Sequence, residues 1–245
     1  MSKTTELTLF EDELAKMAVQ AVADSSSGTA PTFLSTKGGQ LTYKDSPIVG
    51  NSLNVVILAS PIERLFYSTR YDANKRSGPT CSAMAVTSIG MKPHSSSAEP
   101  QHATCAGCPR DQWGSSLSGT AGKACAEKKR LLLMTADSVT TPENVAMAEV
   151  VALRTPVTSG KPFDLYLQKA VMLARRPLST VITKISLVPD PKNQFRLQFD
   201  YVKPVDDMAL VKALLDRAAK ELSQTFMTVG VEEEVEPSAD SSSKF

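Results

Sequence analysis

Residues 179–202 read STVITKISLVPDPKNQFRLQFDYV, which is two extended segments joined by a turn. In the second segment Phe195, Leu197 and Phe199 alternate with polar side chains, the period-two pattern of a half-buried antiparallel strand. Proline, aspartate and asparagine in residues 189–194 favour the turn. The stretch therefore predicts a β-hairpin and, with it, an antiparallel sheet.

Other short extended segments, rich in β-branched and aromatic residues, recur along the chain. They lie at residues 32–43, 53–59, 62–68, 82–86, 130–134 and 147–154. Three segments have the apolar periodicity of a helix, at residues 9–23, 162–175 and 206–223. This pattern predicts an α+β fold that is mainly antiparallel β, with peripheral helices, and the number of strands fits a small barrel.

The chain divides into three parts by composition. Residues 1–30 are expected to form a helix and a linker, and residues 31–228 the β core, which includes the helix at 206–223. Residues 229–245 are acidic and poor in apolar side chains, which predicts a disordered tail. Within the core, residues 78–128 contain little regular pattern. A loop of that length is expected to be functional, or to be held by something other than a hydrophobic core.

The net charge of +1 hides an uneven distribution. Residues 75–130 carry eight Lys or Arg and three Asp or Glu, and residues 161–204 carry the same numbers, so each segment has a charge of +5. The last fifteen residues carry five acids and one lysine, a charge of −4. A basic body suggests polyanionic partners, and an acidic tail suggests a basic partner or shielding of the chain's own surface.

The four cysteines, Cys81, Cys105, Cys108 and Cys125, all lie in the irregular loop region, and two of them form a C-x2-C pair. Four thiolates can hold one zinc ion tetrahedrally, and such a site can replace the apolar contacts that a Gly/Ser-rich loop cannot make. We therefore predict structural zinc. An iron–sulfur cluster, a redox pair and free buried thiols are the alternatives. His102 or His94 could replace one cysteine as a ligand.

No catalytic motif accompanies the cysteines. The sequence contains no phosphate-binding G-x-x-x-x-G-K-[ST] loop, no G-x-S-x-G nucleophile elbow and no H-x-E upstream of the C-x2-C pair. We therefore expect no enzymatic activity. No apolar run reaches the length of a membrane span, and the acidic start of the chain is unlike a signal peptide. The expected location is the cytoplasm, without membrane association.

Basic and aromatic residues surround the cysteines and could bind nucleic acid. Trp113, the single tryptophan, could stack on a base or could instead pack over the metal site. Cations would follow the phosphate backbone. The candidate DNA-binding residues are Lys37, Tyr67, Arg70, Tyr71, Trp113, Lys123, Lys128, Lys129 and Arg130.

The tail contains a second candidate binding segment, with four glutamates and a terminal aromatic residue. An acidic peptide ending in phenylalanine can dock into an apolar pocket flanked by a basic residue, although a purely solubilising tail has the same composition. The candidate partner-binding residues are Glu232, Glu233, Glu234, Glu236 and Phe245.

These features together resemble the single-stranded DNA-binding proteins of bacteriophage replication. The resemblance rests on the hairpin at 179–204, on the segments GNSLNVVILASPIERLFYSTRYD, CAGCPRDQWGS and GKAC, and on the tail. It implies an oligonucleotide-binding (OB) barrel that coats single strands in replication and recombination and recruits replication proteins through its tail. It also implies host cytoplasm for a phage-encoded chain, and oligomerisation with further copies would fit. Only the tail residues are carried over from the family.

A second interpretation comes from another class of protein. A zinc-stabilised regulatory or adaptor protein would use the same loop to bind a protein or duplex DNA, although no helix suited to reading a duplex is evident. A third interpretation is an assembly component in which the zinc site is only structural.

Overall fold

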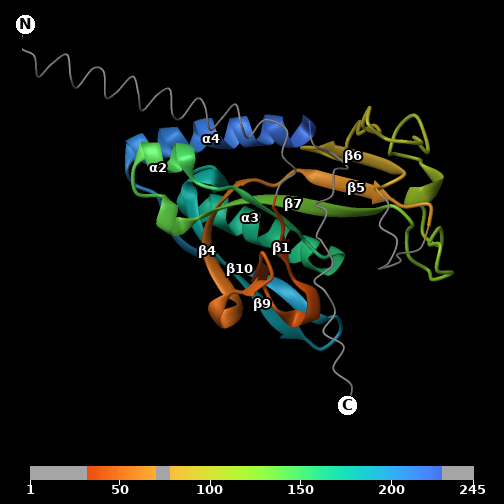
Figure 1. Ribbon diagram of the computed structural model, residues 1–245, viewed down its shortest axis with the longest axis horizontal. Coiled ribbons are helices and arrows are strands. Elements are labelled where there is room, and N and C mark those ends of the chain that lie inside the picture. The colour runs from red at the N-terminus through yellow and green to blue at the C-terminus, as the bar shows by residue number, and fades with distance from the viewer. Residues whose placement is uncertain (1–31, 70–77, 228–245) are drawn as a thin grey trace, which may run out of the picture.

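The computed structural model describes residues 32–69 and 78–227 (Figure 1). Within these ranges, no helix combines the length and apolar character needed to cross a bilayer. The helix expected at 9–23 and the tail expected from 229 lie outside the described residues.

A seven-stranded antiparallel sheet forms the centre of the molecule. Its strand order is β10-β9-β4-β7-β5-β6, and β8 pairs with β7 beside this path. The strands are β4 (Ser52–Ala59), β5 (Ile62–Phe66), β6 (Cys81–Ala85), β7 (Ala126–Thr135), β8 (Val151–Arg154), β9 (Val181–Asp190) and β10 (Gln194–Pro204). A small second sheet contains β1 (Leu34–Ser35), β2 (Thr42–Tyr43) and β3 (Ser46–Pro47).

The long strand β7 connects two parts of the sheet. Its residues 126–129 pair with β5, whereas residues 132–135 pair with β4 and residues 130–133 pair with β8. β4 and β5 therefore pair with successive stretches of β7, and β5 and β6 lengthen the sheet beyond the end of β4. The edge strands β6 and β10 are not paired with each other in the described residues. The sheet therefore stays open, and the OB-like barrel expected from the sequence is not formed.

Helices cover both faces of the part of the sheet that contains β4, β9 and β10. Helix α3 (Gly160–Ala174) packs on one face, where Phe163 and Tyr166 meet Phe199 of β10. Helices α2 (Pro142–Met147) and α4 (Met208–Met227) lie on the other face, where Val145 and Leu214 are fully buried. Figure 1 shows α4 running along one side of the sheet and α3 along the other. The fold is thus α+β and mainly antiparallel, as predicted.

Most elements agree with the sequence prediction. The hairpin at 179–202 is β9 and β10, and the helices expected at 162–175 and 206–223 are α3 and α4. The strand expected at 147–154 begins only at Val151, because Met147 is the last residue of α2 and residues 148–150 connect that helix to β8. Thr141 caps that helix by accepting a hydrogen bond from the Asn144 amide, and Pro142 occupies its first turn.

A buried ionic cluster lies where the two parts of the sheet join. The Glu63 carboxylate on β5 pairs with Arg130 of β7, and its Oε2 lies 2.7 Å from Arg154 Nε on β8. Glu63 and Arg130 are almost completely buried. Since a buried charge is tolerated only when it is paired, this cluster links three strands.

Candidate functional site

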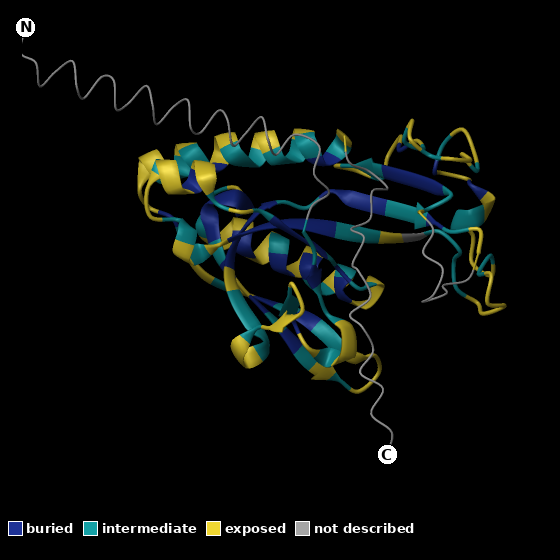
Figure 2. Ribbon diagram, viewed as in Figure 1, coloured by how far each residue is buried: buried dark blue, intermediate teal, exposed yellow. Residues whose placement is uncertain are grey.

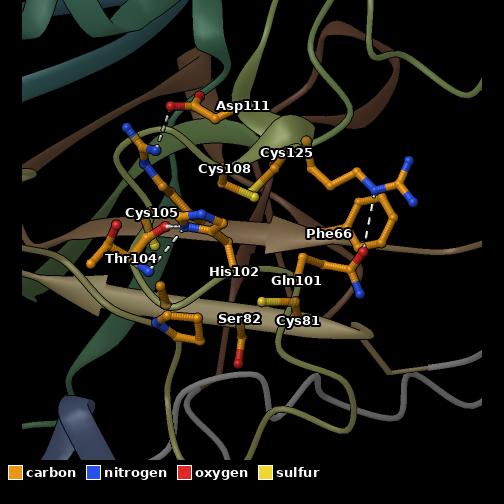
Figure 3. A pocket seen from close by; sticks show the side chains of 14 residues that line it. Phe66, Cys81, Ser82, Gln101, His102, Thr104, Cys105, Cys108, Asp111 and Cys125 are labelled. Atoms are coloured by element: carbon orange, nitrogen blue, oxygen red, sulfur yellow. Dashed lines mark hydrogen bonds and ion pairs between the residues drawn. The ribbon is translucent and has the colours of Figure 1, made fainter.

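The four cysteines line one pocket (Figure 3). The strands β5 and β6, which contribute to it, lie at the end of the sheet farthest from α2 (Figure 1). Cys81 comes from β6, Cys105 and Cys108 from the loop that follows it, and Cys125 from the residue before β7. The first three are buried and Cys125 is half-buried. We call β5, β6 and residues 86–125 the cysteine lobe. Its loops carry many exposed residues (Figure 2).

The pairing of β5 with β6 builds the floor of the pocket. Phe66 is the partner of Cys81, and Arg64 is the partner of Ala83. Because side chains alternate between the faces of a strand, these four residues share one face, and all four line the pocket. The loop packs onto this floor, where Cys105 joins Ala83 in a small apolar cluster.

A tight turn brings Cys105 and Cys108 to the pocket. The Cys108 amide donates to the Cys105 carbonyl at 3.4 Å, and Gly107 has φ +81°, a conformation that glycine adopts without strain. The chain then returns to the same place at Cys125, whose amide donates to the Arg110 carbonyl at 2.9 Å. Backbone hydrogen bonds therefore position three of the four thiols.

The four thiols are not in disulfides, and burial favours the protonated form of two of them, Cys105 and Cys125. Burial raises the pKa of Cys105, and the Arg64 cation opposes this effect. Burial also raises the pKa of Cys125 to about 12, again against Arg64, and the neighbouring thiols add to the increase. Without a metal ion, these two side chains are neutral thiols at pH 7.

Four thiols around one pocket are a donor set that suits zinc. In residues 32–69 and 78–227, however, no three or more His, Cys, Asp or Glu side chains already form a metal-binding group. The side chains would have to draw together around an ion. His102 also lines the pocket, but its Nδ1 lies 2.8 Å from the Thr104 carbonyl oxygen. His94 is not among the lining residues, and its Nδ1 lies 2.6 Å from Ser96 Oγ.

Trp113 stands on the outside of the cysteine lobe and is 79% exposed. The Lys123 ammonium lies over its ring, 5.6 Å from the centroid. Lys123 Nζ is also 2.9 Å from Asp111 Oδ1, and Asp111 Oδ2 is 2.8 Å from Arg64 Nη1. A chain of ion pairs thus leads from the pocket to the exposed indole. The predicted alternative, in which Trp113 packs over the metal site, does not agree with this exposure.

The other predicted DNA-binding residues are not gathered into one surface. Arg130 is fully buried against Glu63, so we leave it out of the interface. Lys129 is mostly buried, with Nζ 3.1 Å from Asp164 Oδ1. Lys128 and Tyr67 are half-buried. Lys37 is exposed in a 3-10 turn (Lys37–Gly39) that contacts β9, outside the cysteine lobe.

Several predicted residues lie outside the described part of the chain. They are Arg70, Tyr71 and the tail residues Glu232, Glu233, Glu234, Glu236 and Phe245.

Two residues of the site were not predicted from the sequence, namely Arg64 and Asp111. The alternation in residues 62–66 could have placed Arg64 on the same face as Phe66. The pairing with Cys81, however, depends on the register between β5 and β6, which one sequence does not specify. Asp111 gave no signal beyond its closeness to Cys108.

Comparison with known proteins returned no match: no family model, no curated protein and no solved structure matches this chain.

Proposed function

We propose that this protein binds single-stranded DNA without sequence preference, in replication and recombination, through the surface around Trp113. The exposed Trp113 ring beside the Lys123 ammonium carries the proposal. A large aromatic side chain that is 79% exposed gains free energy when another flat apolar surface covers it. A nucleobase provides such a surface, and the adjacent cation suits the phosphate that accompanies the base.

The charge of the segment supports a polyanionic partner. Residues 75–130 have a net charge of +5, and the chain has eight lysines or arginines there. Binding that neutralises phosphates releases condensed counterions, which adds affinity that does not depend on sequence. An aromatic ring within a basic segment is the combination that non-specific single-strand binders use.

Zinc is the second part of the proposal. Cys81, Cys105, Cys108 and Cys125 would hold it, and its role would be structural. The bound ion would supply a four-way cross-link in a lobe whose apolar cluster has only a few members. A fixed loop keeps Trp113 and Lys123 together, which lowers the entropy lost when DNA binds.

The acidic tail is the third part. We assign to it the recruitment of replication proteins, because a segment with a net charge of −4 suits a basic surface on a partner. Docking of Phe245 in a pocket of the partner would give this contact its apolar anchor.

The test compares two substitutions in the cysteine lobe. Trp113→Ala removes the proposed stacking ring, and Ile89→Ala removes another apolar side chain, 86% exposed, from the same lobe. A labelled oligo-dT and fluorescence anisotropy give the affinity of each variant. Trp113→Ala should weaken binding by roughly 5- to 150-fold, since stacking contributes about 1–3 kcal/mol per base. Ile89→Ala should bind as the wild type does.

Equal affinities for Trp113→Ala and the wild type would contradict stacking by this residue. Wild-type protein that binds a duplex of the same length as tightly as oligo-dT would favour the regulatory interpretation. If the wild-type protein binds neither DNA, the DNA-binding proposal is wrong, and the interpretation as an adaptor that binds protein is favoured.

A further inference from the structure

Arg64 reaches the cysteine pocket from β5, whereas Arg110, which also lines the pocket, comes from the loop. It lies on the same face of β5 as Phe66, whose partner across the register is Cys81. Its side chain is only 11% exposed. A charged group this far from water needs partners for all of its N–H groups.

Two of its nitrogens have carboxylate partners. Nη1 lies 2.8 Å from Asp111 Oδ2, and Nη2 lies 2.7 Å from Glu127 Oε2. Nε is buried as well, and it has no hydrogen-bond partner among the described residues. A buried N–H without an acceptor is costly, so the Arg64 side chain has one donor that requires an acceptor.

Cys105 and Cys125 line the same pocket as Arg64, so their sulfur atoms are candidate acceptors for this donor. A neutral thiol is a weak acceptor, whereas a cysteine that coordinates a metal is a thiolate, with a charge that attracts an N–H donor. A divalent ion held by four thiolates has a net charge of −2, and burying it requires a compensating cation.

We propose that Arg64 is the positioning residue of the metal site, donating its Nε–H to Sγ of a metal-bound Cys105 or Cys125. Its positive charge offsets part of the charge of the site, and the ligand set is the four cysteines without His102. This inference rests on the proposed zinc-stapled loop. It extends that proposal, because it names the group outside the ligand set that tunes affinity for the ion.

The test compares Arg64→Lys with Glu127→Gln. Lysine keeps the charge but has no Nε–H in a planar fork, whereas Glu127→Gln alters one partner of the guanidinium and leaves Nε–H in place. Zinc affinity comes from competition with a coloured chelator. Arg64→Lys should weaken it about 10- to 100-fold, the range for groups that orient metal ligands. Glu127→Gln should change it by less than about 3-fold on the same reasoning.

A spectroscopic measurement separates this role from a general loss of structure. In cobalt-loaded protein the thiolate-to-metal charge-transfer band should shift in Arg64→Lys and not in Glu127→Gln, because an N–H···S bond withdraws charge from sulfur. If Arg64→Lys changes neither the zinc affinity nor the charge-transfer band, the proposal is overturned. So would equal losses of affinity in the two variants.

A third measurement needs no variant and therefore does not depend on folding of a mutant. The wild-type protein is loaded with a magnetically active cadmium isotope, and nuclear magnetic resonance detects a coupling between cadmium and the Arg64 Nε–H across the N–H···S bond. Its presence supports the proposal, and its absence in cadmium-loaded protein contradicts it. If the wild type binds none of zinc, cobalt and cadmium, the metal part of the proposed function fails too. The oligo-dT titration then decides DNA binding separately.

Discussion

At the scale of single residues, burial separates side chains that look equivalent in the sequence. The run Lys128, Lys129 and Arg130 reads as one basic cluster. In the strand, Lys129 reaches Asp164, whereas Arg130 is enclosed with Glu63. Trp113 is an apolar side chain that turns out to be exposed, and its position in a polar loop did not decide between exposure and packing. The sequence shows the charge and type of each of these residues, but it does not show what surrounds their side chains in the fold.

Glu63 provides a prediction for stability and its dependence on pH. Burial acts to raise the pKa of its carboxyl, but Arg130 and Arg154 outweigh burial and hold the pKa below its usual value. The stability from this group is thus complete above about pH 4.3, the ordinary glutamate pKa, and is lost as the pH falls through the lower folded value. Glu63→Gln should cost about 3–5 kcal/mol at pH 7, since it leaves buried arginines without a counter-charge.

Urea denaturation of the wild type and of Glu63→Gln measures this difference. The gap in unfolding free energy should narrow at acid pH, where the wild-type carboxyl is protonated as well. The exposed Glu99→Gln is the control and should change stability by less than about 0.5 kcal/mol. A gap that does not change with pH would show that the carboxylate charge is not what stabilises the cluster.

At the scale of elements, local pattern predicted most strands and the two long helices. The alternation in β10 and the apolar face of α4 each arise within one segment, so one sequence contains the signal. The short helix α2 was not predicted: the pattern assigned no element to residues 142–146, and only Met147 fell in the strand expected at 147–154. Whether the sheet closes into a barrel could not be predicted, because this depends on which strands pair with each other. In the structure β4 and β5 both pair with β7, and the sheet stays open. For the site, spacing indicated the cysteines, while Arg64 required the register of β5 with β6.

The cysteine loop gives a prediction at this scale. Cys108→Ser should remove bound zinc from the purified protein and weaken oligo-dT binding, because the loop that carries Trp113 loses its cross-link. The main sheet should remain folded, since its core lies outside the cysteine lobe. Metal content by mass spectrometry and far-ultraviolet circular dichroism provide the measurements. Ser118→Ala, in an exposed position of the same loop, is the matched control. Zinc content equal to that of the wild type would contradict the proposed ligand set.

At the scale of the whole molecule, the described part of the chain is an open sheet with helices on both faces and a cysteine-lined lobe at one end (Figure 1). The basic segment 75–130 includes much of this lobe, and the opposite charge lies in the last fifteen residues. An acidic segment joined to a basic body can compete with nucleic acid for the basic surface. The sequence alone predicted this imbalance, because charge can be counted without knowing the fold.

Removing residues 231–245 provides a prediction for this competition. The deletion takes away a net charge of −4, and the affinity for oligo-dT should rise several-fold at low salt. The gain should shrink as salt is added, since charges are screened over about 10 Å at 0.1 M. Anisotropy titrations at two salt concentrations measure both effects. An unchanged affinity at low salt would show that the tail does not compete with DNA and would favour the adaptor interpretation.

The most direct test of the central claim is a titration of intrinsic fluorescence with oligo-dT and, separately, with a duplex of equal length. The chain has one tryptophan, so the signal reports Trp113 alone. Single-stranded DNA should quench it and the duplex should not. Salt should reverse the effect, with a log–log slope of about −0.7 for each phosphate neutralised. Equal quenching by both DNAs, or no change with either, would contradict single-strand binding through Trp113.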